Sequence, residues 1–288
     1  MPSPLPTTIE RARPLLGTVV VVQVEGKGTA LVESAIAAAF DAMSSVQRSM
    51  SFHDPDSDLS RINRTAAHAP QAVCGPLRRV LRASLVLAQY SGGGFDPSVA
   101  GELVRRGQLP GPGANCGVDP EANWRDVELS RDGLIRYRKP LWLDLGGIAK
   151  GYAVDRAIHA LRLAGMRSGA VNAGGDLRVF GDSMRTIRVR DPLTPSCARP
   201  LLQVRNGAVA TSSGCFSIRD GHTALVDPLH RGSLGIGVSA TVCAPRAIWA
   251  DALTKIVLAD AESSLSLLRR LHAQAIIVGG DGAMRMLQ

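Results

Sequence analysis

Residues 143–155, which read LDLGGIAKGYAVD, combine side chains and spacing that suit binding of a phosphate group. A short strand is expected to end at Asp144, two glycines turn the chain, and a helix is expected from about Ile148. Glycines let a ligand approach the backbone, and the free N–H groups at the start of a helix attract phosphate. Lys150 falls in the first turns of this helix, where its ammonium can neutralise a phosphate or pair with a carboxylate. An ordinary strand–turn–helix joint has the same pattern, so this segment alone leaves both interpretations open.

Seven other segments rich in glycine, aspartate, serine or threonine accompany this one along the chain. They are RPLLGTVVVV at 13–22, MSFHDPDSDLSRIN at 50–63, GGGFDPSVAGELVRRG at 92–107, VNAGGDLRVFG at 171–181, VATSSG at 209–214, VDP at 226–228 and ADALTK at 250–255. In this order, and together with residues 143–155, they resemble the ApbE family of FAD:protein FMN transferases. The resemblance covers about residues 14–258, and although each segment alone is a weak signal, eight in register are specific.

The resemblance implies a fold, a substrate and a reaction. The expected fold is α+β: one ApbE-like, T-fold-related domain over residues 1–288, with mixed or antiparallel sheets, flanking helices and FAD in a groove between two lobes. The expected reaction cleaves the FAD pyrophosphate, attaches FMN through a phosphoester to a Thr or Ser of a client flavoprotein, and releases AMP. The resemblance also implies magnesium, which suits this chemistry because a divalent metal neutralises the charge that develops on the phosphates.

The resemblance also assigns roles to individual residues by their position. The expected FAD-binding residues are Leu16, Phe52, His53, Gly94, Phe95, Asp96, Asp144, Lys150, Thr211 and Val238. Leu16 replaces a common Met, and His53 stands where an aromatic ring often stacks on the flavin, with Phe52 beside it as a substitute. Magnesium prefers oxygen donors, and the expected metal ligands are Gly147 through its carbonyl, Asp251 and Thr254. The expected catalytic residues are His222, Lys150 and Asp251.

Two positions depart from the family pattern. The family usually carries H-x-x-D-P, but Ala224 stands at the histidine position here, and His222 lies two residues earlier. In an extended segment these two residues would share a face, so His222 could fill the role, or no residue does. The family often has Thr four residues after the metal-binding Asp, where this chain has Lys255. Thr254 is one position earlier, about 100° around the helix, and the Lys255 ammonium could replace part of the metal charge or reject the metal.

These departures leave two alternatives to the transferase open. One is a flavin-binding protein that has no transfer activity, and the other is an FAD pyrophosphatase that transfers nothing to a protein. Three further positions also have two interpretations each. Asp155 could cap a helix or pair with arginines, Asp176 could fix the adjacent glycine turn or reach the site, and residues 211–214 could bind a phosphate or form a strand corner.

Hydrophobic periodicity and turn residues predict the elements that position these segments. Helices are predicted over residues 30–49, from about 59, and over 75–90, 148–163, 247–258 and 261–271. Strands are predicted over residues 16–24, 142–145, 169–172, 186–189, 200–204, 208–211, 216–218, 235–243, 274–278 and 284–287, with a hairpin over 127–138. No linker is long or polar enough to divide the chain, so one domain is expected.

Composition narrows the class of protein. The net charge of +8 favours an anionic ligand or simple solubility over nucleic acid, because the basic residues are scattered and form no stripe with interleaved aromatics. The five cysteines are odd in number and lack C-x-x-C spacing, which argues against a disulfide scaffold and against a zinc site. No apolar run approaches the roughly 18 residues of a membrane span. The N-terminus does not follow the signal-peptide pattern, so a cytoplasmic location is expected, or a periplasmic one if a leader was removed.

Overall fold

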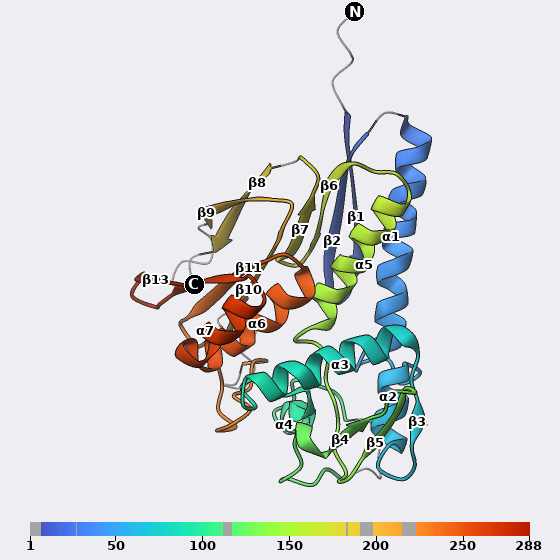
Figure 1. Cartoon of the computed structure of the whole chain (residues 1–288), viewed down its shortest axis with the longest axis vertical. Coiled ribbons are helices and arrows are strands. Elements are labelled where there is room, and N and C mark those ends of the chain that lie inside the picture. Colours follow the sequence, from blue (N-terminus) through green and yellow to red (C-terminus); the bar gives the residue numbers. More distant parts are fainter. Residues whose placement is uncertain (1–6, 27, 112–116, 183, 191–197, 215–222) are drawn as a thin grey trace, which may run out of the picture.

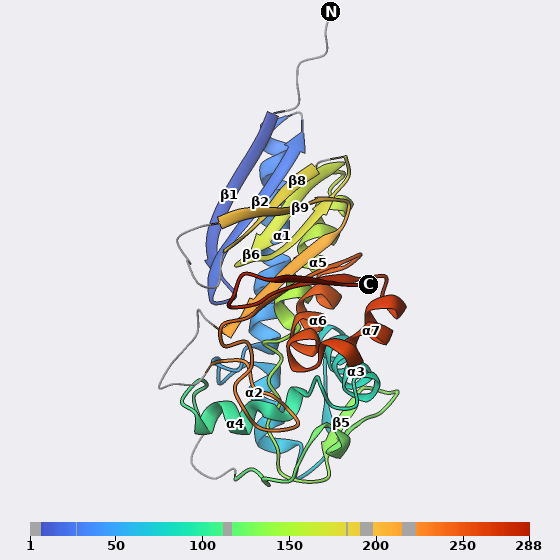
Figure 2. The same cartoon turned by 90° about the vertical axis from the view of Figure 1, so that its left-hand side faces the viewer.

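The computed structural model describes residues 7–26, 28–111, 117–182, 184–190, 198–214 and 223–288, and these residues form an α+β fold. Figures 1 and 2 show a large sheet with helices packed on one face, and a smaller lobe below it. The described helices are α1 (Thr29–Met50), α2 (Asp58–Thr65), α3 (Gly75–Tyr90), α4 (Ala100–Arg105), α5 (Ala149–Leu163), α6 (Ala247–Ala259) and α7 (Ala261–Arg270). The predicted fold class is confirmed.

The large sheet has eight strands in the order β1-β2-β6-β7-β10-β11-β12-β13, and every neighbouring pair is antiparallel. Its strands are β1 (Thr7–Leu15), β2 (Thr18–Gly26), β6 (Ser168–Ala173), β7 (Asp176–Phe180), β10 (Ala208–Ser213), β11 (Ser239–Ala244), β12 (Gln274–Val278) and β13 (Met284–Leu287). A two-stranded ribbon, β8 (Met184–Arg190) with β9 (Ala198–Arg205), lies beside it. The smaller lobe holds α2, α3, α4 and a sheet of β3 (Gln71–Ala72), β5 (Leu134–Tyr137) and β4 (Val127–Leu129).

The main hydrophobic core lies between the large sheet and the helices that cover it. Apolar residues at alternate strand positions pack there against the apolar faces of the helices. Val20, Val22 and Val24 are fully buried on one face of β2, as expected for a strand that is covered on one side. The apolar face of α1, which includes Ile36 and Phe40, packs on the sheet and against α5, and α5 in turn packs against α6. The two helices that carry Lys150 and Asp251 are therefore neighbours in the core.

By length and composition alone, α1 is the single described helix that could cross a membrane. Its residues Ile36, Phe40 and Met43 are buried in the protein core. Packing on the sheet and on α5 thus accounts for its apolar character, as in other core helices.

Most predicted elements are present, and the exceptions have identifiable physical causes. The strand predicted over 16–24 is present as β2 but begins only at Thr18, because the chain turns at Leu16 and Gly17 after β1. Residues 142–145 are not a strand, because the backbone N–H and carbonyl of Leu143 bond to the Asn63 side chain at 2.8 and 2.9 Å. The strand predicted over 235–243 begins only at Ser239, after glycines with positive φ. The predicted strand 216–218 lies outside the described residues.

A glycine allows α5 and α6 to approach closely. A Cβ atom at Gly151 would lie 2.2 Å from the carbonyl oxygen of Ala247 and 2.8 Å from the Cβ of Asp251. The Gly151 N–H donates a hydrogen bond to Oδ2 of Asp251 at 3.0 Å. The absence of a side chain at this position therefore sets the distance between the helices that carry the candidate site.

We expect Gly151→Ala to lower the free energy of unfolding by about 2–3 kcal/mol, because the added methyl group overlaps the backbone of α6. Gly75→Ala is the matched control, since nothing lies within 4 Å of a Cβ at this first position of α3. The control should change the free energy of unfolding by less than about 0.5 kcal/mol. Urea unfolding at 25 °C measures both, and equal stability of the two variants would contradict the close-contact argument.

Candidate functional site

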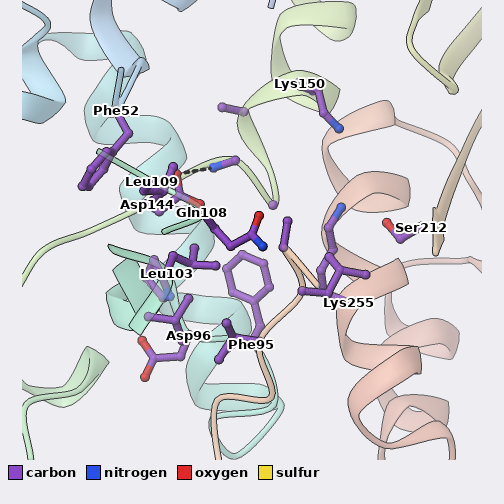
Figure 3. A pocket seen from close by; sticks show the side chains of 18 of the residues that line it. Phe52, Phe95, Asp96, Leu103, Gln108, Leu109, Asp144, Lys150, Ser212 and Lys255 are labelled. Carbon is purple, nitrogen blue, oxygen red and sulfur yellow. Dashed lines mark hydrogen bonds between the residues drawn. The ribbon is translucent and has the colours of Figure 1, made fainter. Parts of the chain in front are cut away.

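A cavity of about 610 Å³ lies where the two lobes meet, and most of its lining side chains are apolar. Figure 3 shows it from close by, with the ring of Phe95 near its centre and the two lysines on one side. Of the expected FAD-binding residues, those that line the cavity are Leu16, Phe52, His53, Gly94, Phe95, Asp96, Asp144 and Lys150. The fold thus gathers eight of the ten into one place, while contact with FAD itself stays a prediction.

The turn between β1 and β2 brings Leu16 to the cavity in a restrained conformation. Leu16 and Gly17 have φ values of 56° and 71°, the positive pair that a two-residue hairpin turn requires. A positive φ is uncommon for leucine. The Leu16 N–H donates a hydrogen bond to Oε1 of Gln47 on α1 at 2.6 Å, which holds the turn against that helix. Gln47 also lines the cavity and was not among the expected residues.

Asp144 stands at the turn before α5, as the sequence predicted. Its backbone N–H donates to the carbonyl of Pro97 at 2.7 Å, and its Oδ1 accepts the Gly146 N–H at 3.1 Å. Burial raises the pKa of the Asp144 carboxyl, although the Gly146 N–H and the nearby His53 counteract part of this effect. Asp144 and His53 both line the cavity, so they form one polar group within its apolar wall.

The start of α5 and the middle of α6 form a row of alternating charges. The Lys150 ammonium lies 2.9 Å from Oδ2 of Asp176, the first residue of β7. On α6, the Lys255 ammonium contacts Oδ1 of Asp251 and donates to the Asp251 carbonyl at 3.0 Å. Lys150 and Lys255 line the cavity (Figure 3), whereas Asp251 is fully buried and is not among the lining residues. Asp176 contacts Lys150 but is not among the residues that line the cavity, so its reach to the site stays a prediction.

Neighbouring charges shift the pKa values of Asp251 and Lys150 toward the ionised form of each group. Burial raises the pKa of Asp251, but the ammonium groups of Lys255 and Lys150 outweigh it and hold this pKa below its usual value. Burial likewise opposes the charge on Lys150, but Asp251 and Asp176 outweigh it and raise the pKa of Lys150. The cavity therefore presents fixed positive charge, which suits a phosphate-bearing ligand.

Asp96 lines the cavity, but its carboxyl has a structural task. Its Oδ1 accepts the N–H and the hydroxyl of Ser98 at 2.7 and 2.6 Å, which caps the short helix η1 (Pro97–Val99). Figure 3 shows the Asp96 carboxyl directed away from Lys150 and Lys255. Burial raises the pKa of Asp96, and the Ser98 hydrogen bonds oppose this rise.

The segment 211–214 contributes a residue other than the one expected. Thr211 is a strand residue whose hydroxyl bonds to that of Thr241 at 2.9 Å, and it does not line the cavity. Ser212 points to the opposite face of β10 and does line it. Val238 is also outside the lining, and its carbonyl accepts the Ser213 hydroxyl at 3.0 Å. In this segment the residue that lines the cavity is therefore Ser212 and not Thr211, and a phosphate contact stays a prediction.

Two of the expected metal ligands, Asp251 and Thr254, are close together and already have partners. Gly147 lines the cavity, and a Cβ at this position would lie 3.7 Å from Cε of Lys255. Thr254 is fully buried, and its hydroxyl donates to the Asp251 carbonyl at 2.7 Å and lies 2.7 Å from the Ser212 hydroxyl. The part of the chain that the structure describes contains no group of three or more His, Cys, Asp or Glu side chains that could hold a metal.

His222 lies outside the described residues, so its expected role stays a prediction. Ala224, at the histidine position of the family pattern, does line the cavity. At the charged end of the cavity, Ser212 was expected only as part of the segment 211–214, and Lys255 only as a possible substitute for the metal charge. Strand alternation and the four-residue spacing from Asp251 are the signals that could have identified them.

Comparisons with known proteins agree with this geometry. In sequence, the chain is 29% identical over 310 residues to the FAD:protein FMN transferase of Treponema pallidum (strain Nichols), covering 96% of this chain and 85% of that protein. It is 26% identical to the FAD:protein FMN transferase of Rhodobacter capsulatus, covering 79% of this chain and 47% of that protein.

Two solved structures have the same fold. The ApbE protein of Thermotoga maritima superposes with a TM-score of 0.86 at 25% identity, covering 98% of this chain and 97% of that chain. The flavin transferase ApbE of Vibrio cholerae superposes with a TM-score of 0.80 at 19% identity, covering 98% and 96%. The profile of the ApbE family matches residues 16–277, nearly the whole chain, and this protein therefore belongs to the ApbE family.

Proposed function

We propose that this chain is an FAD:protein FMN transferase, which transfers FMN from FAD to a Thr or Ser hydroxyl of a client flavoprotein. One observation carries the proposal: the ammonium groups of Lys150 and Lys255 line one side of a cavity that is otherwise largely apolar. The flavin ring of FAD is flat and mostly apolar, while its pyrophosphate is negatively charged, so each part meets a matching surface. The relatives from T. pallidum and R. capsulatus carry the name of this activity, which supports the proposal.

In the proposed reaction, the client hydroxyl oxygen attacks the phosphorus of the FMN half of FAD. The bond from this phosphorus to the AMP oxygen breaks, AMP leaves with the bonding electrons, and the hydroxyl proton passes to a base. Lys150 and Lys255 stabilise the negative charge that develops on the phosphate oxygens. The carboxylates of Asp176 and Asp251 orient these ammonium groups before FAD binds. His222 remains our proposed base.

Magnesium, which the resemblance implies, does not fit the arrangement of these residues. One oxygen of the buried Asp251 carboxylate contacts the Lys255 ammonium, and the other accepts the Gly151 N–H at 3.0 Å. The Thr254 hydroxyl is occupied by the Asp251 carbonyl and by Ser212. We therefore propose that Lys255 supplies the positive charge at this position, and we assign no step of the reaction to a metal.

Lys150→Met tests the role of the ammonium at the start of α5. We expect the variant to release AMP from FAD at least about 100-fold more slowly, because an interaction with the developing phosphate charge is lost. Lys139→Met is the control, since Lys139 lies in a partly exposed ion pair with Asp119 and Glu121, whose residues are not among those lining the cavity. The assay measures AMP by chromatography, and mass spectrometry measures FMN on a client carrying an acceptor Thr.

Three outcomes of this assay separate the candidate functions. Release of AMP with a gain of FMN mass on the client supports the transferase. Release of AMP without client modification would favour a pyrophosphatase instead. FAD binding with no AMP release would contradict both enzymatic assignments and indicate a flavin-binding protein.

Lys255→Thr tests the proposal that an ammonium takes the place of a metal. The wild type should release AMP equally fast, within about twofold, in magnesium and in excess EDTA, and should not bind Mn²⁺ in the absence of FAD. The variant should lose AMP release in EDTA by about 100-fold, because the carboxylate of Asp251 is left without its cation. It should also bind Mn²⁺, as measured by electron paramagnetic resonance.

Lys139→Thr provides the control for this second test and should behave as the wild type in every measurement. Loss of wild-type AMP release in EDTA, or Mn²⁺ binding by the wild type with the affinity of Lys255→Thr, would overturn the assignment to Lys255. Such results would leave the transferase proposal itself intact, because product formation in magnesium tests that proposal separately.

A further inference from the structure

A second cavity, of about 310 Å³, shares no lining residue with the first and is lined by more arginines than any other residue type. Five guanidinium groups line it, and they come from four elements: Arg79 from α3, Arg156 and Arg162 from α5, Arg178 from β7, and Arg246 from the start of α6. We propose that this arginine cavity binds a small phosphate-bearing anion, with inorganic pyrophosphate or a nucleotide monophosphate as the class of ligand.

Asp155 is the single acidic residue in the lining, and its carboxylate is already fully engaged. Its Oδ1 accepts the N–H of Ala247 at 3.0 Å and contacts Arg178, while its Oδ2 accepts the N–H of Ile248 at 3.2 Å. Arg246 lies 3.4 Å from the same Oδ2 atom. Asp155 thus both caps α6 and pairs with arginines, which confirms both interpretations drawn from the sequence. One carboxylate, however, compensates only one of the guanidinium charges.

The other arginines have neutral partners or none. Arg79 donates to the Tyr152 hydroxyl at 3.0 Å, and Arg162 donates to the side-chain oxygen of Asn206 at 3.2 Å. Within the described part of the chain, the side chain of Arg156 makes no hydrogen bond or ion pair. Five guanidinium groups against one carboxylate leave four positive charges uncompensated among the lining residues.

The proximity of these charges is unfavourable without a ligand. Partial burial and the charge of Arg178 lower the pKa of Arg162, although Asp155 opposes this effect. Such crowding of like charges is relieved when an anion enters, because each guanidinium then gains a charge-assisted hydrogen bond. The cluster differs in this respect from the surface arginines of the chain, such as Arg105 and Arg138, which pair with a glutamate each.

Two features of the cavity, its guanidinium groups and its small volume, indicate a small phosphate-bearing anion as the ligand. Guanidinium groups bind the oxygens of phosphate in a two-pronged geometry that an ammonium cannot provide. A volume of about 310 Å³ accommodates a small anion, at the lower end of ordinary ligand sites. The lining residues converge from α3, α5, β7 and the start of α6 on one small hollow, whereas a nucleic acid would need an extended basic surface.

Isothermal titration of the full chain with pyrophosphate, in low salt and without divalent metal, tests the proposal. We expect the wild type to bind one pyrophosphate in this cavity. The double variant Arg156→Gln with Arg162→Gln should bind at least about 100-fold more weakly, at roughly tenfold for each charge-assisted contact removed. The control, Arg105→Gln with Arg138→Gln, removes two exposed guanidinium groups elsewhere and should bind pyrophosphate as the wild type does.

Further titrations distinguish AMP from pyrophosphate as the ligand, and the arginine cavity from the first cavity as the binding site. Tighter binding of AMP than of pyrophosphate, lost in the same double variant, supports the cavity and identifies a nucleotide monophosphate as its ligand. Lys150→Met should leave this binding unchanged. Loss of pyrophosphate binding in Lys150→Met but not in the arginine double variant would place the anion in the first cavity and overturn the proposal. Equal weakening in the control pair would overturn it as well, because it would show binding to overall charge.

Discussion

The rest of the site depends on one fully buried carboxylate, that of Asp251, at the contact between α5 and α6. A buried charge of this kind is tolerated only with compensating partners. Here the Gly151 N–H, the Lys255 ammonium and the nearby charge of Lys150 provide them. Because each partner comes from one of two helices that touch, the requirement to satisfy this carboxylate also fixes how the helices lie. The two lysines are consequently held at the wall of the cavity.

The same constraint accounts for the proposed replacement of a metal by the Lys255 ammonium in the cavity of this ApbE-family chain. Lys255 lies one helical turn after Asp251, so its side chain can return to the carboxylate that relatives are expected to share with a metal. An ammonium is held by the chain itself and needs no uptake from solution. Its single charge is smaller than that of a divalent ion, and Lys150 adds a second charge to the same end of the cavity.

Local patterns predicted the helices and most strands, because these depend on periodicity and on caps such as Ser57, which accepts the Ser60 N–H at the start of α2. The segments that resemble the ApbE family likewise predicted where the first cavity lies, since they contain most of the residues that line it. Two details depended on long-range partners that no local pattern encodes. Residues 142–145 are not a strand because Asn63, about 80 positions earlier, takes their backbone bonds. Ser212 rather than Thr211 lines the cavity, because the pairing of β10 with its neighbouring strands decides which of the two alternating side chains points to that side of the sheet.

The strand β7 connects the surroundings of the two cavities. Asp176 and Arg178 lie two residues apart, on the same face of this strand, and the first pairs with Lys150 while the second lines the arginine cavity. α5 contributes to both cavities in the same manner, through Lys150 and Asp155. The two cavities are thus connected by the same helix and strand, so a ligand that shifted these elements on one side would change the affinity on the other. Thermodynamic reciprocity then requires that such an influence be equal in both directions.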